Sequence, residues 1–392
     1  MTGNKKSHIL FHRPTPWDSK INCSTKIFAC RFAEAGYPVS YLQSLINPGH
    51  LLSKKGYYET WKKGSRLDRG VWVTAGFSLI PDMDRYTTTA RLTGRLRYRM
   101  CIPGIPTQVR ESGNGDPQII WTTVPGSSAL KDLFPGAKLI FHVIDNYAAY
   151  RGPGVTVLEA EDYRRADHIF AIGQALHDRL VADFRVDPQK ITVLGQGVAL
   201  EKYTGDFSVP DELAGLPRPL AIWVGLEKKL DFDLLDAAAR EIGRAGGSTV
   251  LIGPGLEAGA AGSYSGNDVV FLGAREPGRI PGFLRASDIG LMLYDRRRDA
   301  IYDGQNPLKL YEYAAAGLPT ISTAHAEFDT LRPPVLTVAT GQDVRAAVRR
   351  ILADPDRLRT RMLDFAAGYS WDRIMNEAVA RIDQLLDDET NA

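Results

Sequence analysis

Short apolar runs alternate with amphipathic stretches along most of the chain. The runs are five to seven residues long and rich in Val, Ile, Leu and Phe, and segments of helical periodicity, such as the one around Thr25–Ala35, separate them. This alternation predicts parallel strands joined by helical crossovers, and therefore an α/β chain with open, doubly wound sheets. The runs predicted as strands are 8–12, 38–42, 71–75, 118–122, 138–144, 168–172, 191–195, 220–225, 248–253, 267–273, 288–294, 318–323 and 335–339.

One polar, proline-bearing stretch, Ser208 to Pro219, interrupts the alternation before a second series of runs begins. Domain boundaries usually fall in such segments, and 392 residues are too many for one compact core. We therefore predict two Rossmann-like domains, 1–205 and 206–370, facing each other across a cleft. The helical periodicity after Trp371 predicts a final helix within 371–392.

Cysteine usage and hydropathy restrict the cellular compartment. Cys23, Cys30 and Cys101 are three in number and show no C-x-x-C spacing, so the sequence supports neither a disulfide framework nor a structural zinc site. No apolar stretch is long enough to span a bilayer, and the N-terminus does not resemble a secretion signal. We expect a cytoplasmic protein.

Charge is distributed unevenly although the net charge is only +2. Residues 1–140 carry 20 basic and 9 acidic side chains, and the remainder has an acidic excess. Within 51–110 the basic excess is interleaved with Tyr and Trp, a mixture that suits an anionic membrane surface. A solvated face and a nucleic-acid site are the alternatives, but no nucleic-acid-binding signature is present and no nucleic-acid partner is expected.

The most informative segment runs from Asn306 to Thr320. It begins with Pro near a predicted helix start and ends with Gly before a strand, and Lys309 and Glu312 lie three residues apart on one helical face. A helix N-terminus attracts anions, so Lys309 would neutralise a diphosphate while Glu312 accepts hydrogen bonds from ribose or sugar hydroxyls. A solvated ion pair between the two is the alternative. The candidate donor-binding residues here are Asn306, Pro307, Leu308, Lys309 and Glu312.

The pattern P-x-K-x-x-E-Y-x-A-x-G-x-P followed by a β-run resembles the nucleotide-sugar motif of GT-B glycosyltransferases, in particular the family 4 group. The resemblance covers most of the chain and is thinnest over 44–115. It implies a nucleotide-diphosphate sugar as donor, a UDP-sugar first and a GDP-sugar as the alternative, with no cofactor and no metal. Other stretches that fit in the same order are Pro14–Lys20, His142–Gly152, Glu159–Leu176, Val193–Tyr203, Trp223–Leu235 and Tyr369–Ile374.

The resemblance also implies further binding residues. The loop that starts at Gly225 would place Lys228 or Lys229 against the donor diphosphate, and Tyr294 would lie near the base or the diphosphate. A charged surface loop and a tyrosine at the core edge are the alternatives. The basic run 296–298 could bind the diphosphate or could be solvated. The candidate acceptor-binding residues are His12, Trp17, Asp18 and Tyr147.

One departure from family 4 concerns the mechanism. Retaining members carry two glutamates eight positions apart, whereas the position eight before Glu312 is Gly304, with Asp303 adjacent. The inverting glucuronosyltransferase of xanthan assembly has a similar layout with an aspartate after a first-domain strand, and Asp145 resembles that residue. At a strand end Asp145 would be partly desolvated, with a raised pKa suited to a general base, unless it only caps a turn.

These observations predict an inverting transferase with Asp145 as base, acting on a lipid-linked saccharide acceptor during surface polysaccharide synthesis, peripheral to the inner face of the membrane. The alternatives are a retaining transferase, in which Asp303 or a backbone group stands in for the missing glutamate, and an epimerase that needs no acceptor. The D-x-D match at Asp82–Asp84 is interpreted as chance. His142 and His168 lie in apolar strands and are expected to be core residues.

Overall fold

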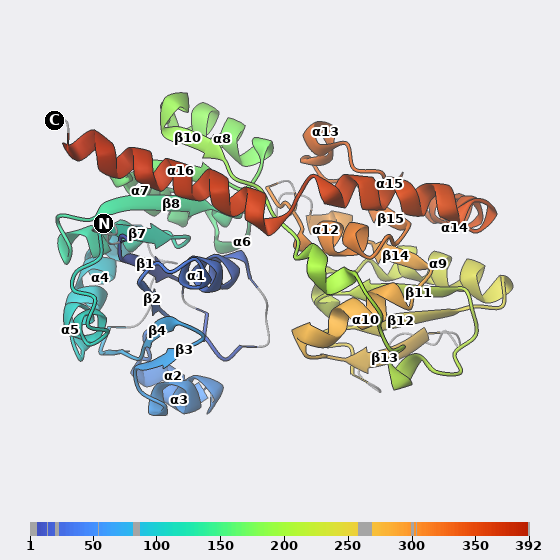
Figure 1. Ribbon diagram of the computed structural model, residues 1–392, viewed down its shortest axis with the longest axis horizontal. Coiled ribbons are helices and arrows are strands. Elements are labelled where there is room, and N and C mark those ends of the chain that lie inside the picture. Colours follow the sequence, from blue (N-terminus) through green and yellow to red (C-terminus); the bar gives the residue numbers. More distant parts are fainter. Residues whose placement is uncertain are drawn as a thin grey trace. The chain divides into compact units, whose positions relative to one another are not determined.

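The computed structural model describes residues 6–13, 15–19, 23–53, 55–80, 87–257, 269–298, 302 and 304–390. The chain divides into two compact units (Figure 1), which we call unit 1, Met1–Gly195 with Met375–Ala392, and unit 2, Gln196–Ile374. Each unit holds a sheet whose strands are mostly parallel, so the predicted α/β class is confirmed. The domain boundaries drawn from the sequence stay predictions.

Unit 1 contains an eight-stranded sheet in the order β10-β9-β8-β7-β1-β2-β4-β3, in which only β3 is antiparallel to its neighbour. A two-stranded ribbon, β5-β6, stands apart from it. The strands are β1 (Ile9–His12), β2 (Val39–Leu42), β3 (Arg66–Asp68), β4 (Val71–Thr74), β5 (Phe77–Ser78), β6 (Cys101–Ile102), β7 (Ile119–Thr122), β8 (Lys138–Val143), β9 (His168–Ala171) and β10 (Ile191–Val193). The α-helices are α1 (Ser24–Glu34), α2 (Pro48–Ser53), α3 (Lys55–Lys62), α4 (Thr87–Arg99), α5 (Ile105–Arg110), α6 (Tyr147–Arg151), α7 (Thr156–Arg165), α8 (Gln174–Phe184) and α16 (Trp371–Thr390).

Successive side chains of β1 bury opposite faces of this sheet, as the period of two in a strand requires. Phe11 packs on Phe32 of α1, with ring centroids 5.8 Å apart, and on Trp121 of β7 at 5.4 Å. Leu10 belongs instead to the core cluster that includes Tyr98 of α4. Helices therefore cover both faces, which explains why these strands read as continuous apolar runs.

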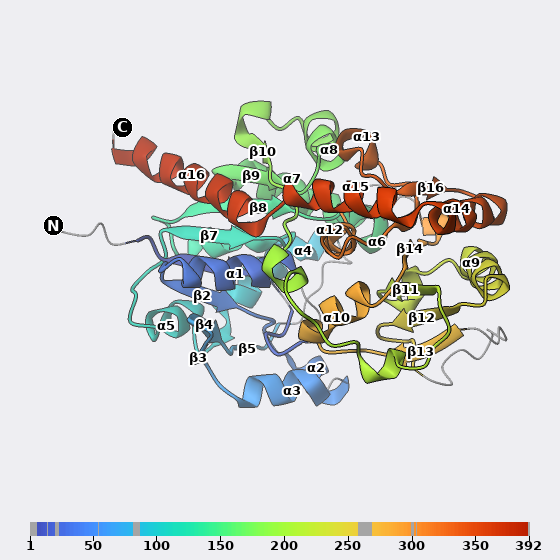
Figure 2. The same cartoon turned by 45° about the vertical axis from the view of Figure 1, so that its right-hand side comes forward.

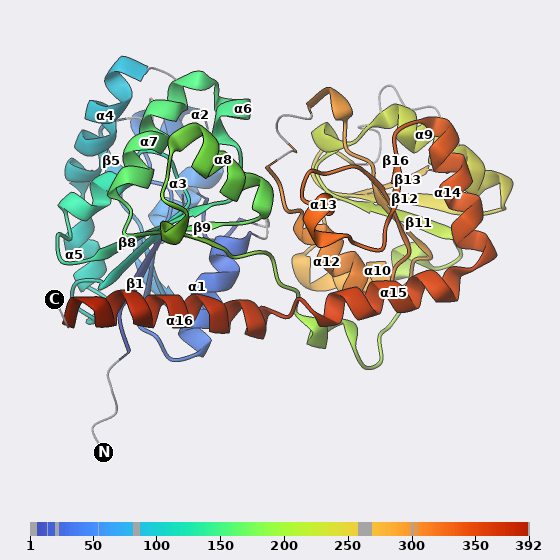
Figure 3. The ribbon, with the colours of Figure 1, turned by 90° about the horizontal axis from the view of Figure 1, so that it is seen from above.

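The long helix α16 begins in unit 2 and continues along unit 1 beside α1 (Figure 3). Arg381 on this helix donates from Nε and Nη2 to Nδ1 of His168 on β9, at 3.2 and 3.0 Å. Thr192 Oγ1 lies 3.1 Å from the other ring nitrogen, so His168 is a satisfied core histidine, as expected. Within the described residues, no helix combines the length and the apolar character needed to cross a bilayer.

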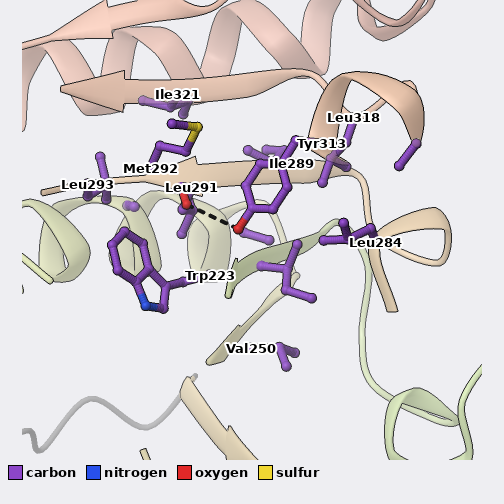
Figure 4. Close-up of a cluster of buried hydrophobic side chains, with 14 of the residues drawn as sticks. Trp223, Val250, Leu284, Ile289, Leu291, Met292, Leu293, Tyr313, Leu318 and Ile321 are labelled. Atoms are coloured by element: carbon purple, nitrogen blue, oxygen red, sulfur yellow. Dashed lines mark hydrogen bonds between the residues drawn. The ribbon is translucent and has the colours of Figure 1, made fainter. Parts of the chain in front are cut away.

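Unit 2 contains a six-stranded parallel sheet in the order β13-β12-β11-β14-β15-β16, flanked by helices that include α9, α14 and α15 (Figure 2). Tyr313 of α12 ties the central strands together: the Val224 N–H donates to its hydroxyl at 2.9 Å, and the hydroxyl donates to the Leu291 carbonyl at 3.4 Å (Figure 4). The strands are β11 (Leu220–Val224), β12 (Ser248–Ile252), β13 (Val269–Gly273), β14 (Ile289–Met292), β15 (Thr320–Thr323) and β16 (Leu336–Val338). The α-helices are α9 (Phe232–Arg244), α10 (Ile280–Arg285), α12 (Leu308–Ala315), α13 (Phe328–Leu331), α14 (Gly341–Ala353) and α15 (Pro355–Ala367).

Every run predicted as a strand contains a strand of the structure. The pattern missed β3, β5 and β6, which have three, two and two residues. Segments this short carry no readable alternation, so only their pairing with a neighbouring strand defines them.

Candidate functional site

Helix α12 begins and ends as its sequence predicts. Pro307 is the N-cap, and no side chain caps the first turn. At the C-terminus Gly317 has φ of +63°, and the N–H groups of Gly317 and Leu318 donate to the carbonyls of Ala314 and Tyr313, both at 2.9 Å. This is a Schellman motif, which requires glycine at the left-handed position. The helix therefore holds its uncapped N-terminus, and Lys309 next to it, in a defined place.

Lys309 brings a buried ammonium to this N-terminus. Its Nζ lies 3.6 Å from the centroid of the Trp223 ring and 4.8 Å from that of Tyr294, and it has no hydrogen-bond partner. Burial holds the pKa of Lys309 well below its usual range, and the nearby charge of Lys229 lowers it further, whereas Glu312 opposes the shift. An ammonium that is buried and unpartnered does not fit the solvated ion pair that the sequence left open.

Two glycine-containing turns make room for this ammonium. A Cβ at Gly225 would lie 2.7 Å from Lys309 Nζ and 3.2 Å from Trp223 Cζ2. Gly253, with φ of +150°, packs backbone to backbone against Gly225, and the Gly225 N–H donates to the carbonyl of Ile252 at 2.8 Å. The loops after β11 and β12 thus approach more closely than side chains would allow, which leaves the Lys309 head against bare backbone.

Of the two candidate lysines in the loop after β11, the structure turns Lys229 inward. Its Nζ donates to Gln305 Oε1 at 3.3 Å and lies 6.0 Å from the Tyr302 ring centroid, while Lys228 is exposed. The backbone of Lys229 also accepts a hydrogen bond from the Asp295 N–H at 3.0 Å. Lys229 and Lys309 therefore converge, and their mutual repulsion is one cause of the lowered pKa of Lys309.

The ring of Tyr294 lies beside these cations and packs against three other aromatic rings. Its ring meets those of Trp223, Tyr302 and His325 edge to face, at centroid distances of 5.5, 5.0 and 4.8 Å. The Tyr294 N–H donates to Thr323 Oγ1 at 3.1 Å, which fastens it to the end of β15. Burial raises the pKa of Tyr294, so the phenol stays neutral.

Asn306 and Glu312 complete the surroundings of α12. Asn306 is buried: its Oδ1 accepts a hydrogen bond from the Tyr311 hydroxyl at 2.9 Å and its carbonyl accepts one from Gln196 Nε2 at 3.3 Å, so it shapes the loop before the helix. Glu312 is half-buried, and burial raises its pKa to about 7 although Lys309 and Lys202 oppose the shift. Glu312 can thus accept or donate a hydrogen bond near neutral pH.

Sequence reasoning did not identify Trp223 and His325. Trp223 has a buried Nε1 without a hydrogen-bond partner, and His325 is 4% exposed with both ring nitrogens unpartnered. Both lie at carboxyl ends of strands, where ligands bind in open α/β sheets. Their position at the carboxyl ends of β11 and β15 was the signal in the sequence, but it does not by itself distinguish a site residue from a core residue.

In unit 1, Asp145 follows β8 and is half-buried. The pKa of Arg13 is raised, although its burial favours a lower value. The groups that raise this pKa are Cys23, Tyr147, Tyr41 and Asp145. The Arg13 guanidinium therefore lies within electrostatic range of the Asp145 carboxylate. Arg13 donates from Nε to Thr15 Oγ1 at 3.2 Å and from Nη1 to Thr123 Oγ1 at 3.4 Å. The sequence did not single out Arg13.

The candidate acceptor residues are packed or paired within unit 1. Trp17 is 1% exposed and donates from Nε1 to Asp68 Oδ2 at 2.8 Å. Asp18 forms ion pairs with Lys63 and Arg66, both at 2.9 Å, which together lower its pKa although its partial burial opposes the shift.

The two remaining candidates are buried as well. His12 Nδ1 lies 3.2 Å from Thr122 Oγ1, and the Tyr147 hydroxyl donates to the Thr123 carbonyl. An acceptor role for these four residues stays a prediction. Asp303, Asp82 and Asp84 lie outside the described residues. No group of three or more His, Cys, Asp or Glu side chains suited to a metal ion occurs in the part of the chain that the structure describes.

The chain is similar in sequence to known glycosyltransferases. Residues 227–387 match the family model described as "Glycosyl transferase-like". A protein of Bacillus subtilis (strain 168), described as "Putative teichuronic acid biosynthesis glycosyltransferase TuaH", is 26% identical over 232 residues. That match covers 54% of this chain and 57% of the relative, so the chain spans less than two thirds of its length.

Solved structures show the same fold over nearly the whole chain. Sucrose-phosphate synthase from Thermosynechococcus elongatus aligns with a TM-score of 0.71 at 14% identity, covering 98% of this chain and 100% of that chain. Anabaena HepE in complex with UDP-glucose aligns with a TM-score of 0.66 at 13% identity, covering 96% and 100%. The chain therefore has the GT-B fold of glycosyltransferase structures, as predicted.

Proposed function

We propose that the protein is a glycosyltransferase that binds a nucleotide-diphosphate sugar in unit 2 and transfers the sugar to a hydroxyl group of an acceptor. The observation that carries the proposal is the buried, unpartnered Nζ of Lys309 at the uncapped N-terminus of α12. An unpaired buried charge is costly, so the site is arranged for an absent anion. Lys229, converging from the loop after β11, adds a second positive charge, as a diphosphate requires.

The family match and the GT-B fold support the donor class. The family model covers the loop after β11, α12 and the edge of the sheet that carries Tyr294 and His325. Anabaena HepE binds UDP-glucose on the same fold, so we take a UDP-sugar as the first donor to test and a GDP-sugar as the alternative. Glu312 and the ring of Tyr294 would contact the nucleoside or the sugar. We also propose that the protein is related to the family 4 group or to the inverting xanthan glucuronosyltransferase.

For the reaction we propose that Asp145 is the general base. The acceptor oxygen attacks the anomeric carbon and gives its proton to the Asp145 carboxylate while the bond from that carbon to the diphosphate breaks, which inverts the configuration. Lys309 and the α12 N-terminus stabilise the departing diphosphate, so no metal is needed in this scheme. Arg13, within electrostatic range of Asp145, would help to orient that carboxylate.

For the acceptor we propose a lipid-linked saccharide at the cytoplasmic face of the membrane, in surface polysaccharide synthesis. The relative named for teichuronic acid biosynthesis supports this pathway class. The ribbon β5-β6 supports membrane contact, because Leu79, Met100 and Ile102 are 53%, 42% and 60% exposed there. The ladder pairs Phe77 with Ile102 and Ser78 with Cys101, and Leu79 and Met100 are the residues that directly adjoin the second pair in the sequence.

Cationic side chains accompany this apolar surface. The exposed Arg99 ends α4, directly before Met100, and Arg95 is exposed one turn earlier. Exposed apolar side chains beside arginines suit the interface of an anionic bilayer.

The donor assignment is tested by titrating the purified protein calorimetrically with UDP, GDP, ADP and CMP in the absence of added metal. We expect one nucleoside diphosphate to bind, and the variant Lys309→Met to lose about a hundredfold in affinity or more, the worth of a charge-assisted contact in a dry site. Arg240→Met is the matched control, because Arg240 is exposed on α9 and pairs with Asp236. Binding that ignores Lys309, or no binding by any nucleotide, would contradict the proposal.

A further inference from the structure

His325 has surroundings that the proposed reaction does not use. It follows β15 and is 4% exposed; Nδ1 and Nε2 make no hydrogen bond of ordinary length, and the Tyr302 backbone is the hydrogen-bonding group that acts on the ring. Buried polar atoms are nearly always paired, and an apolar residue would fill the same space without leaving two ring nitrogens unsatisfied. The ring therefore presents unused hydrogen-bonding capacity inside the site.

Aromatic rings pack against His325, and cationic side chains act on it electrostatically. Its ring lies edge to face on Tyr294, at 4.8 Å and 88°, and 5.0 Å from the ring of Phe328. The charged groups that act on it are Lys309 from α12, Arg296 from the loop after β14, and Lys229 from the loop after β11. Among the described residues these influences are all positive.

The nearest acidic residue along the chain is Glu327. Glu327 acts on the hydroxyls of Tyr311 and Tyr369, whose pKa values it helps to raise after the effect of burial. Burial, followed by the three cations, lowers the pKa of His325 to about 4, and only the Tyr302 backbone opposes the shift. The free protein thus holds a neutral imidazole within electrostatic range of three cationic side chains.

We propose that His325 is a further binding residue for the donor diphosphate and takes up a proton when the donor binds. This inference rests on the proposed function of the site. A diphosphate places two negative charges among Lys309, Lys229 and Arg296, which removes the repulsion that keeps His325 neutral and offers acceptor oxygens to its N–H. Lys309 becomes fully charged in the same step, so proton uptake has two sources that variants must separate.

The experiment is calorimetric titration of UDP-glucose into the wild type and His325→Gln in two buffers of different ionisation enthalpy, HEPES and Tris, at the same pH. The dependence of the observed enthalpy on the buffer gives the number of protons taken up. UDP-glucose is suitable because its doubly esterified diphosphate does not titrate near neutrality. His177→Gln is the matched control: His177 lies on α8 of unit 1, half-buried and 3.0 Å from Asp178.

We expect His325→Gln to bind UDP-glucose about tenfold more weakly near pH 6 and to take up about half a proton to one proton fewer than the wild type, as the loss of one titrating contact requires. His177→Gln should match the wild type. Equal proton uptake by the wild type and His325→Gln would overturn the inference while leaving the donor site intact. Absence of Lys309-dependent binding in the wild type would instead contradict the proposed function, and this inference with it.

A second measurement does not depend on the variant folding. Nitrogen-15 spectra of labelled imidazoles in the wild type follow all 7 histidines of the chain. We expect one imidazole to change from neutral to protonated on addition of UDP-glucose. Spectra in which no histidine changes its protonation state at saturating UDP-glucose would overturn the inference.

Discussion

The Nζ atom of Lys309 lies 3.6 Å from the centroid of the Trp223 ring and has no hydrogen-bond acceptor. A cation–π contact compensates part of the desolvation of an ammonium, on the order of 2 kcal/mol when it is buried. It does not replace several hydrogen bonds. The Lys309 ammonium is therefore only partly compensated by Trp223, and its burial lowers the free energy of unfolding of unit 2.

Removing that charge should stabilise the folded protein. We expect Lys309→Met to raise the free energy of unfolding of unit 2 by about 1–2 kcal/mol while donor binding is lost, because an uncompensated buried charge disappears. Since the pKa of Lys309 is lowered on folding, the unfolded chain binds the extra proton and wild-type stability rises with pH. The gain should consequently be larger at about pH 6 than at about pH 9. Denaturant unfolding measures it, and a destabilised variant would argue that Lys309 has a structural role.

The position of the Lys309 ammonium requires that residue 225 has no side chain. A Cβ there would lie 2.7 Å from Lys309 Nζ, so Gly225→Ala should displace the ammonium and weaken donor binding about tenfold or more, with little loss of folding. Gly282→Ala on α10 is the control, because its Cβ would meet only atoms at 3.7 Å and beyond. Calorimetry of both variants checks the expectation, and donor affinity unchanged in Gly225→Ala would contradict it.

Glu312 makes stability depend on pH. Burial raises its pKa from 4.5 to about 7, so the folded protein keeps a proton that the unfolded chain releases between these values. Stability from this group is therefore present below about pH 4.5 and is lost as the pH rises through about 7. We expect wild-type stability relative to Glu312→Gln to fall by about 2 kcal/mol over that range, after allowance for solvent screening. Parallel unfolding curves at all pH values would show that the pKa is not raised.

Loss of the proposed base should affect the chemical step alone. We expect Asp145→Asn to lower kcat about 10²- to 10⁴-fold, with donor affinity nearly unchanged, since a general base acts on the acceptor proton. Asp183→Asn is the control, because Asp183 is an exposed partner of Arg179. The anomeric configuration of the product, read by NMR, tests inversion separately. A kcat within a few-fold of wild type would remove Asp145 from the mechanism.

Membrane contact is expected to require the ribbon β5-β6. The double variant Leu79→Ser, Ile102→Ser should reduce co-sedimentation with vesicles that contain phosphatidylglycerol by about tenfold, because two exposed apolar side chains leave the interface. Val193→Ser is the control, since Val193 is 37% exposed on β10. Equal binding of the wild type and the double variant, or no preference for anionic over phosphatidylcholine vesicles, would contradict the assignment.

Much of the fold was predictable from local pattern. Strands buried on both faces and helices with one apolar face leave periodicities that need no tertiary information. Helix α12 is an instance, because Pro307 and Gly317 mark its ends by backbone chemistry alone. The edge strand β3 was not predictable, because its Arg66–Asp68 segment becomes a strand only by pairing with β4.

Some residues of the candidate donor site were likewise predictable from the sequence, and others were not. Residue type and spacing singled out Lys309 and Glu312 as candidates, since a phosphate site needs a cation near a helix N-terminus, and the family resemblance added Gly225. Trp223 and His325 were not found, because an aromatic residue or a histidine after a strand is ordinary until its neighbours are known.

What the sequence by itself determined is therefore the order of strands and helices and the presence of a lysine at the start of one helix. The tertiary structure decided how that lysine is solvated. Only the packing of α12 against Trp223 of β11 and Tyr294 after β14 places its Nζ between aromatic rings without a hydrogen-bond partner. Charge state depends on burial and on neighbours distant in the sequence, and chain order alone specifies neither.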